Sequence, residues 1–207
     1  MENTGNSKEM LRKLLEKIEK QQQIISHISS LPLIEHGDVE KLSACITEVA
    51  VEVTGVERSG IWLFNEDETE LRCIDLYEAT LRQHSCGYIR SGHEFSAEFS
   101  CLKSSKYIAS DDPLSDTETR GYAETYLKPL HITSMLASVI KYSGKNSGII
   151  CFEHVDRKHH WEYDEISFAC QLADQIAFAI SNRKKKDAEE VMKKKEERYS
   201  RIAATIP

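Results

Sequence analysis

The last third of the chain has the clearest pattern of hydrophobic and polar positions. Residues 132–142 and 147–155 are two apolar, β-branched runs, and residues 144–146 join them through a glycine. This pattern predicts an antiparallel hairpin, because glycine readily adopts the positive φ that a tight turn needs. After a loop through Trp161, apolar residues recur every three or four positions as far as Ile180, which predicts a helix with one buried stripe. Strands followed by a helix that packs back on them predict an α+β fold.

A strand pair and a covering helix are predicted earlier in the chain. Residues 57–64 and 70–77 form the pair, and the first of these strands carries large apolar groups on both faces. It is therefore expected to be a central strand covered on both sides. The helix before it begins at an N-cap, Asp38, and ends at Gly55, where a left-handed residue stops helices.

The middle of the chain is less clearly patterned. We expect a further strand within residues 87–95, a short helix over 97–102 and a strand over 106–109. A serine followed three residues later by a glutamate has the form of a capping box and predicts a helix over 115–126.

The first predicted helix is capped by Asn6 with Glu9 as the reciprocal acceptor, and Leu31-Pro32 ends it because proline lacks the amide donor. Its apolar residues alternate at spacings of three and four around a single glutamine, which is typical of a helix that pairs with a copy of itself. The alternative is a helix that lies on its own domain. The residues assigned to a dimer interface are Leu11, Leu14, Ile18, Gln21, Ile25 and Ile28.

Composition restricts the class of protein. A chain of 207 residues that is 40% hydrophobic can form one globular domain with helical extensions. Six cysteines without a Cys-x-x-Cys pair, several of them in apolar runs, indicate a reducing compartment, so we expect a cytoplasmic protein. No signal-peptide pattern and no run of about 18 apolar residues occurs, which predicts no membrane contact in this chain. A formal net charge of −7 argues against a nucleic-acid partner.

Four segments, in their order and spacing, resemble a known family. They read YIASDDPLSDTETRGYAETYLKPL, ITSMLASVI, GIICFEHV and WEYDEISFACQLADQIAFAI. They are similar to a GAF domain of the kind found ahead of bacterial sensor kinases and cyclic-di-nucleotide enzymes. The resemblance covers residues 39–182. It implies an antiparallel sheet of about six strands, with the N- and C-terminal helices on one face and short helices and loops that form a pocket on the other.

The resemblance also implies the organisation of the chain. Residues 32–182 would be the GAF domain and 183–207 a helical linker with the truncated start of the next domain, while the spacing described above makes 1–31 an N-terminal helix with a dimer seam. The last residues, EERYSRIAATIP, resemble the opening of a PAS-type domain, so a downstream signalling domain is expected in the same polypeptide.

The pocket is placed by the resemblance alone. In the family, a loop and short helix like those at residues 111–126 form a lid over one face of the sheet. The pocket for an unidentified small molecule would then be lined by Tyr107, Asp111, Asp112, Tyr122, Met135 and Glu153.

Other chemistry has weaker support from the residues. The five residues Glu153, His154, Asp156, His159 and His160 lie close together, but their spacing fits no recognised metal-ligand set, and a solvated strand end is the simpler interpretation.

Cys86 and Cys101 lie near the expected pocket, and some GAF domains use such thiols to reduce methionine sulfoxide. Thiol reactivity requires a lowered pKa, which no sequence shows. His84 or His131 could ligate haem on side-chain chemistry alone. The light-sensing relatives typically attach a bilin through Cys-His, a pair absent here. No motif therefore supports a bilin, haem or metal, and the cofactor stays unknown.

The interpretation that follows is a non-catalytic sensory module that binds a small molecule and signals through its terminal helices to an output domain. One alternative is a dimerisation scaffold with a vestigial pocket. Another is a thiol-based enzyme of the methionine sulfoxide reductase type, disfavoured because no nucleophile, base or metal set assembles.

Overall fold

A computed structural model describes residues 3–93 and 95–205 of the protein. Its helices are α1 (Asn3–Ser29), α2 (Pro32–His36), α3 (Val39–Thr54), α4 (Ser96–Ser104) and α5 (Tyr163–Thr205), with a 3₁₀ turn η1 (Arg120–Tyr122) and a π-helical turn η2 (Ala123–Leu127). Its strands are β1 (Arg58–Phe64), β2 (Glu70–Glu78), β3 (Gln83–Ser85), β4 (Ile89–Ser91), β5 (Tyr107–Ser110), β6 (Ile132–Tyr142) and β7 (Lys145–Val155).

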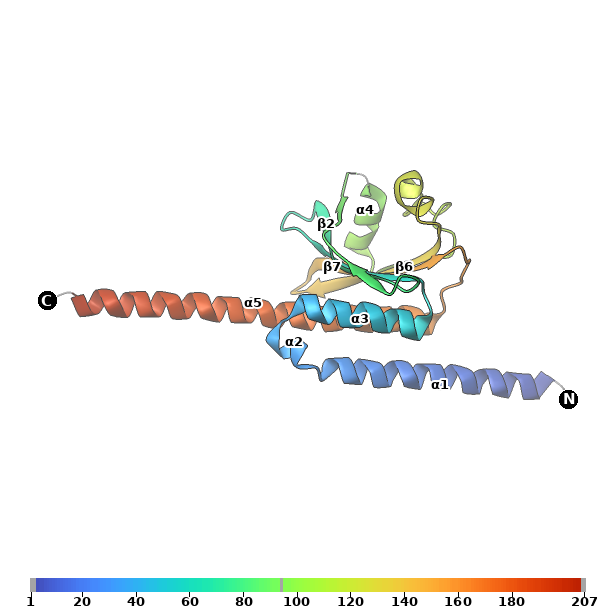
Figure 1. Cartoon of the computed structure of the whole chain (residues 1–207), viewed down its shortest axis with the longest axis horizontal. Helices are drawn as coiled ribbons and strands as arrows, with labels where there is room; N and C mark the ends of the chain where they lie inside the picture. The colour runs from blue at the N-terminus through green and yellow to red at the C-terminus, as the bar shows by residue number, and fades with distance from the viewer. Residues whose placement is uncertain (1–2, 94, 206–207) are drawn as a thin grey trace.

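The strands form one antiparallel sheet in the order β3-β2-β1-β7-β6-β5, and β4 also pairs with β2. In Figure 1, α3 and α5 lie against one face of the sheet and α1 lies outside them, while α4 and the yellow segment of η1 and η2 lie over the other face. The expected α+β fold, with terminal helices on one face and short helices on the other, is confirmed.

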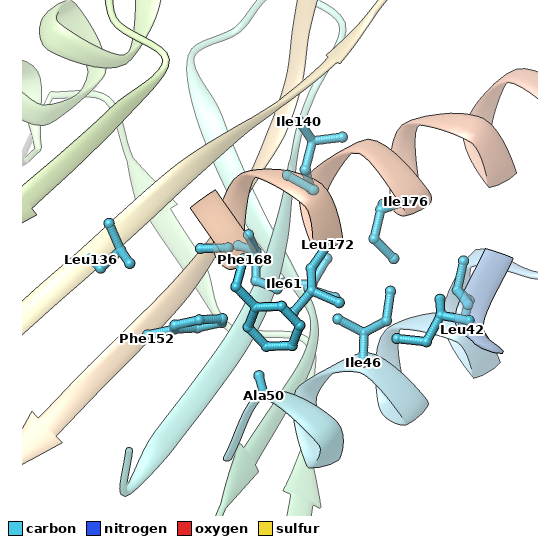
Figure 2. Close-up of a cluster of buried hydrophobic side chains, with 14 of the residues drawn as sticks. Leu42, Ile46, Ala50, Ile61, Leu136, Ile140, Phe152, Phe168, Leu172 and Ile176 are labelled. Atoms are coloured by element: carbon cyan, nitrogen blue, oxygen red, sulfur yellow. The ribbon is translucent and has the colours of Figure 1, made fainter. Parts of the chain in front are cut away.

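The larger hydrophobic core lies between the sheet and the two long helices α3 and α5. Figure 2 shows how the helices and strands contribute to it, because one apolar stripe of each helix meets the inward side chains of the central strands. The labelled members are Leu42, Ile46, Ala50, Ile61, Leu136, Ile140, Phe152, Phe168, Leu172 and Ile176. A second core on the other face includes Trp62 of β1, while Leu63 packs against the first, so β1 is covered on both sides as predicted.

The predicted caps of α3 are confirmed. The carboxylate of Asp38 accepts a hydrogen bond from the backbone N–H of Lys41 at 3.2 Å. Gly55 ends the helix with a φ of 72°, a left-handed value that costs glycine little. The short helix α2, which starts at Pro32, was not among the predicted elements.

The hairpin is confirmed, but its turn lies elsewhere. Ser143 and Gly144 form a two-residue turn with φ values of 51° and 76°, and Tyr142 pairs directly with Lys145. Two consecutive positive φ values match the twist of the flanking strands. The strand therefore starts at Lys145, and Lys145 and Asn146 belong to the ladder and not to the turn.

The predicted helix over 115–126 is wrong. Ser115 donates its hydroxyl hydrogen bond to Asp112 at 3.1 Å and caps no helix, and the Thr119 hydroxyl donates to the carbonyl of Pro113 at 2.7 Å. These local bonds hold the segment in turns, so helical structure begins only with η1 and η2. Within 87–95 the strand is confined to β4, Phe95 precedes α4, and Glu94 lies outside the described residues.

Helix α1 runs parallel to α5 and packs on it. Lys17 forms ion pairs with Asp164 at 2.9 Å and Glu165 at 3.2 Å, and Gln22 donates to Gln171. The helix begins at Asn3, before the predicted cap, and the side chain of Asn6 lies outside those described.

Two residues of the predicted dimer seam are covered within the protomer. Gln21 is 4% exposed and donates to Asp164, and Ile28 is fully buried in the larger core. Their periodicity therefore serves intramolecular packing. Leu11 and Leu14, in contrast, are 57% and 42% exposed.

The last helix is longer than its apolar pattern. α5 continues through the predicted linker to Thr205 as one helix of 43 residues. At the start of α5, the Glu165 carboxylate accepts a hydrogen bond from the backbone N–H of Glu162 at 3.1 Å. This is the bond by which the acidic residue of a capping box satisfies a free backbone donor. Residues 206–207 of the segment that resembles a PAS opening lie outside the described residues. Across residues 3–93 and 95–205, none of the helices combines the length and apolarity needed to span a bilayer.

Candidate functional site

A cavity of about 410 Å³ opens on the face of the sheet opposite the long helices. Strands β1, β2 and β4 supply its floor and one wall, and Phe95 before α4 together with η2 closes the other side. We call it the Arg90 cavity. Its lining residues are Arg58, Trp62, Leu76, Glu78, Tyr88, Ile89, Arg90, Phe95, Thr125, Tyr126 and Leu130.

Arg90 is the most unusual residue of this cavity, because it is charged yet only 2% exposed. Strand pairing places it there, since β4 lies along β2 with Arg90 opposite Leu71. Its guanidinium lies 4.2 Å from the ring centre of Trp62 and 4.2 Å from that of Tyr126. The two aromatic faces stabilise a cation that has lost much of its hydration.

Buried carboxylates compensate the charge of Arg90. Its Nη2 lies 3.4 Å from Oε1 of Glu153 on β7, and its Nη1 lies 3.7 Å from Oε1 of Glu98 on α4. Tyr126 donates its hydroxyl to the same Glu153 oxygen at 2.6 Å. Arg58 donates from Nε to Glu153 at 3.1 Å and from Nη1 to Glu78. The cavity is thus backed by a connected network of ion pairs.

This network is incompletely hydrogen-bonded. Among the described residues, Nε and Nη1 of Arg90, Nε1 of Trp62 and both oxygens of Glu98 are buried without a hydrogen-bond partner. A buried polar atom left unpaired costs free energy, so most native proteins satisfy such atoms. Arg90 and Trp62 both line the cavity, so three of these atoms belong to residues of its wall.

Burial changes the acid–base behaviour of two groups beside Arg90. It raises the pKa of Glu98 to about 6, although the nearby guanidinium of Arg90 acts in the opposite direction. It also raises the pKa of Tyr126 well above its ordinary value, so the phenol keeps its proton and remains a donor to Glu153.

The six residues that sequence analysis assigned to the pocket fall into two groups in the structure. Glu153 lies behind the cavity floor, and its carboxylate contacts Arg58 and Arg90. Tyr122 and Met135 are buried beside it, where the Tyr122 hydroxyl lies 3.3 Å from the Met135 sulfur. None of the three has atoms on the cavity wall.

Tyr107, Asp111 and Asp112 lie elsewhere. They belong to β5 and the loop after it, at the far edge of the sheet from β2. Asp111 accepts from the backbone N–H of Trp161 at 3.1 Å, and Asp112 accepts from Ser115. Their contacts therefore fasten the start of α5 and a turn, and the structure does not bring them to the cavity.

Sequence reasoning missed four residues that line the cavity: Arg58, Trp62, Arg90 and Tyr126. One signal was present, because Arg58 lies near the start of the segment 57–64 that was predicted to be a central strand. A charge at the start of a strand covered on both sides needs a partner. Arg90 gave no comparable signal, since β4 has only three residues.

The acidic and histidine-rich segment after β7 separates into different contacts. Glu153 faces the cavity, whereas its neighbour His154 faces the helices and stacks on Trp161 at 5.4 Å between ring centres. Nε2 of His159 lies 2.7 Å from Glu165, and His160 contacts Asp111. Asp156 pairs with His131 at 3.2 Å. Within the described residues, no three His, Cys, Asp or Glu side chains are arranged to hold a metal ion.

Neither candidate thiol lines the cavity. Cys86 is exposed, and Cys101 is partly buried with its sulfur 3.6 Å from the hydroxyl of Ser105. Burial raises the pKa of Cys73 to about 12 and also raises that of Cys151, so both remain protonated thiols.

Two larger hollows, of about 600 and 740 Å³, lie on the helix side of the molecule. The first is bordered by Lys141, Gln171 and Asp174, and the second by Glu66, Glu68 and Lys145. A third, of about 440 Å³, lies beside Lys194 and Arg198 on α5. None of the three is lined by a residue with the unpaired buried atoms described above. The Arg90 cavity is therefore the better candidate for a binding site.

Small-molecule sites are typically concave and mostly apolar with a few placed polar groups, and the Arg90 cavity has this form. The family model for the GAF domain matches residues 38–180, and the chain belongs to this family. None of the curated proteins matches it.

Solved structures with the same fold have low sequence identity. The phycoerythrobilin-bound GAF domain of a cyanobacterial phytochrome is 17% identical, with a TM-score of 0.65 over 78% of this chain and 95% of that chain. A domain of a two-component sensor histidine kinase protein from Sinorhizobium meliloti is 17% identical, with a TM-score of 0.56 over 73% and 97%. Free methionine-R-sulfoxide reductase from Neisseria meningitidis with its substrate is 12% identical, with a TM-score of 0.65 over 82% and 93%.

Proposed function

We propose that this chain is a non-catalytic sensory GAF module that binds a small molecule in the Arg90 cavity and signals through α1 and α5. The observation that carries the proposal is that two residues lining the cavity, Arg90 and Trp62, contain buried donor atoms without a hydrogen-bond partner. A vestigial pocket is expected to be filled by side chains with paired polar atoms, so these donors favour binding over a pure scaffold.

The similar structures are consistent with this role. The phytochrome domain is described with a bound bilin, the reductase with its substrate, and the third belongs to a sensor histidine kinase. The same fold therefore holds small molecules in some of these proteins. A downstream output domain in the same polypeptide is part of the proposal.

A contiguous set of contacts supports transmission from the cavity to the helices. Glu153 and His154 are neighbours on β7, so their side chains point to opposite faces of the sheet. Glu153 contacts Arg90 on the cavity side. His154 packs on the other side against His159, with ring centres 4.5 Å apart.

The same path continues to the start of α5 and the middle of α1. His159 lies 2.7 Å from Oε2 of Glu165, near the start of α5, and Oε1 of Glu165 accepts from Lys17 of α1 at 3.2 Å. A shift of β7 on ligand binding would thus change contacts that join α1 to α5. Differential binding to two helix arrangements is what a ligand needs to shift their populations.

Pairing of two copies through α1 is the remaining part of the proposal. Four large apolar side chains of α1 are exposed: Met10, Leu11, Leu14 and Leu15. They lie before Lys17, which pairs with α5, and in Figure 1 the N-terminal end of α1 extends past the domain. A second α1 could cover them as in a short coiled coil.

A thermal-shift screen of a metabolite library tests the binding function. At least one compound should raise the melting temperature of the wild-type chain, and Thr125→Trp, which fills the cavity mouth, should abolish that rise. Mass spectrometry of the purified protein and a visible absorbance spectrum check for a bound metabolite, haem or bilin.

If no compound stabilises the protein and nothing is found bound to it, the dimerisation scaffold is favoured instead. Thiol-dependent turnover lost in Cys86→Ser or Cys101→Ser would favour the reductase.

A further inference from the structure

The charges on the wall of the Arg90 cavity are unequal. Arg58 and Arg90 contribute two guanidinium groups, and Glu78 is the one carboxylate among the lining residues. Glu98 and Glu153 lie behind Arg90 and are not part of the wall. The wall therefore presents two guanidinium groups and one carboxylate to a molecule that enters, while the two other carboxylates of the network lie behind Arg90.

Two residues of the wall contain buried donor atoms that lack a hydrogen-bond partner. These atoms are Nε and Nη1 of Arg90, which is 2% exposed, and Nε1 of Trp62, which is 3% exposed. A carboxylate offers two acceptor oxygens in the geometry that a guanidinium fork binds best. Because water is largely excluded from both residues, such hydrogen bonds contribute more here than on the surface.

The rest of the wall is apolar and largely aromatic. Trp62, Tyr88, Phe95 and Tyr126 offer ring faces and edges, and the other apolar lining residues are Leu76, Ile89 and Leu130. Aromatic side chains bind flat rings by offset stacking and edge contacts. A volume of about 410 Å³ lies near the lower end of the range for small-molecule sites, which suits one or two rings.

We propose that the Arg90 cavity binds a small organic carboxylate with a planar, apolar body. Its carboxylate accepts from Arg90 and from the indole N–H of Trp62, and its body lies among the aromatic side chains. This assignment rests on the proposed sensory function and names the chemical class of its ligand.

Glu98 makes the binding depend on pH. The groups that face it are Arg90 on β4, Glu153 on β7, and Tyr122 of η1. Because burial raises the pKa of Glu98 to about 6, a falling pH neutralises it while a ligand carboxylate of pKa about 4 stays ionised. Loss of this negative charge behind Arg90 removes a repulsion. The affinity for an acid should therefore rise as the pH falls from about 7.5 to 6.

Matched compounds test the class of ligand. We would titrate the full 207-residue chain with benzoate, phenylacetate and indole-3-acetate, and with the neutral amide and the primary amine that correspond to each acid. Calorimetry and thermal shift with millimolar ligand should show that at least one acid binds. The corresponding amide and amine should bind at least about tenfold more weakly, because neither can form the charge-assisted pair with a guanidinium.

Four variants test the residues. Trp62→Phe keeps the ring but removes the N–H, and Arg58→Gln removes one charge of the lining, so each should weaken acid binding by about tenfold. Arg72→Gln is the matched control, because Arg72 is exposed on the neighbouring strand and lines no part of the cavity. Glu98→Gln should bind the acid several-fold more tightly at neutral pH and lose the pH dependence. A gain of affinity cannot come from a misfolded protein.

The outcomes separate this inference from the proposed function. If an amide, an amine or a library compound binds in the cavity and none of the three acids does, the carboxylate assignment is wrong and the sensory function stands. Acid binding that Trp62→Phe, Arg58→Gln and Glu98→Gln leave unchanged also overturns it. If no compound of any class binds, the sensory function itself fails.

Discussion

His84 connects the edge strand β3 to β2 and to α3 through one carboxylate on each. Its Nδ1 lies 3.0 Å from both oxygens of the buried Asp75, and its Nε2 lies 3.0 Å from Glu48. Burial lowers the pKa of His84, but the hydrogen bonds to Glu48 and Asp75 outweigh it and raise the pKa above its ordinary value. Its stabilising effect is then complete below the unfolded pKa of about 6.5 and is lost as the pH rises through the folded pKa.

We therefore expect His84→Gln to lower the free energy of unfolding most below about pH 6.5, with a difference from wild type that shrinks as the pH rises. Urea unfolding at a series of pH values measures this difference. His27→Gln on the exposed side of α1 is the matched loss of an imidazole. A difference for His84→Gln that stays constant with pH would contradict the interpretation.

Gly148 permits the close approach of β7 to β1. A Cβ at this position would lie 2.1 Å from the backbone carbonyl oxygen of Trp62, and a strand carbonyl cannot move away without breaking the ladder. Gly148→Ala should lower the free energy of unfolding by about 3 kcal/mol, the upper range for overpacking. Gly121→Ala, with no atom within 4 Å of the new Cβ, should change it by less than about 0.5 kcal/mol. Equal effects of the two substitutions in chemical denaturation would refute this account.

Among the secondary-structure elements, α1 has two parts that serve different purposes. Ile28 is fully buried in the core shared with α3 and α5, so Ile28→Ala should lower the free energy of unfolding by about 2–5 kcal/mol. Leu11→Ala and Leu14→Ala remove exposed side chains and should leave the unfolding of the isolated protomer nearly unchanged.

The paired substitution of Leu11 and Leu14 tests the dimer. Sedimentation velocity over a range of concentrations should show weaker association for Leu11→Ala/Leu14→Ala and unchanged association for Glu19→Ala, an exposed control on the same helix. A wild-type chain that stays monomeric at every concentration would remove the α1 seam from the proposal.

The elements that sequence predicted well are those whose signals are local. The cap at Asp38, the stop at Gly55 and the apolar stripe of α5 are each set by neighbouring residues, and the structure has all three. The helix predicted over 115–126 was wrong because the hydroxyl of Thr119 bonds to the backbone carbonyl of Pro113 and holds the segment in turns. A capping-box pattern does not reveal this competing bond.

The cavity could not be predicted in the same way, because its parts are brought together by the register of the sheet. Arg90 on β4 meets Trp62 on β1 and Tyr126 on η2, three segments far apart in sequence. The resemblance to the GAF family correctly implied a cavity on this face. It did not determine which residues of this chain line that cavity.

For the whole molecule, the sheet separates the ligand cavity from the helices that would carry the signal. The charge network behind the cavity ends at Glu153, and the cluster of His154, His159 and Trp161 begins on the other side of the same strand. Both are packed tightly, so a displacement of β7 at one face must be accommodated at the other. This arrangement predicts that binding and transmission can be separated by mutation.

His159→Ala should separate them. It removes the bond to Glu165 near the start of α5 without touching the cavity, so phenylacetate should bind with nearly wild-type affinity. In the wild type, phenylacetate should change the rate of hydrogen exchange in α1 residues 17–28, which contact α5. In His159→Ala this change should be lost, because the contact that couples the cavity to the helices has been removed. His36→Ala, an exposed histidine on α2, should retain it. A full response of α1 in His159→Ala would show that coupling travels by another route, and equal losses of binding and response would show that His159 supports the cavity itself.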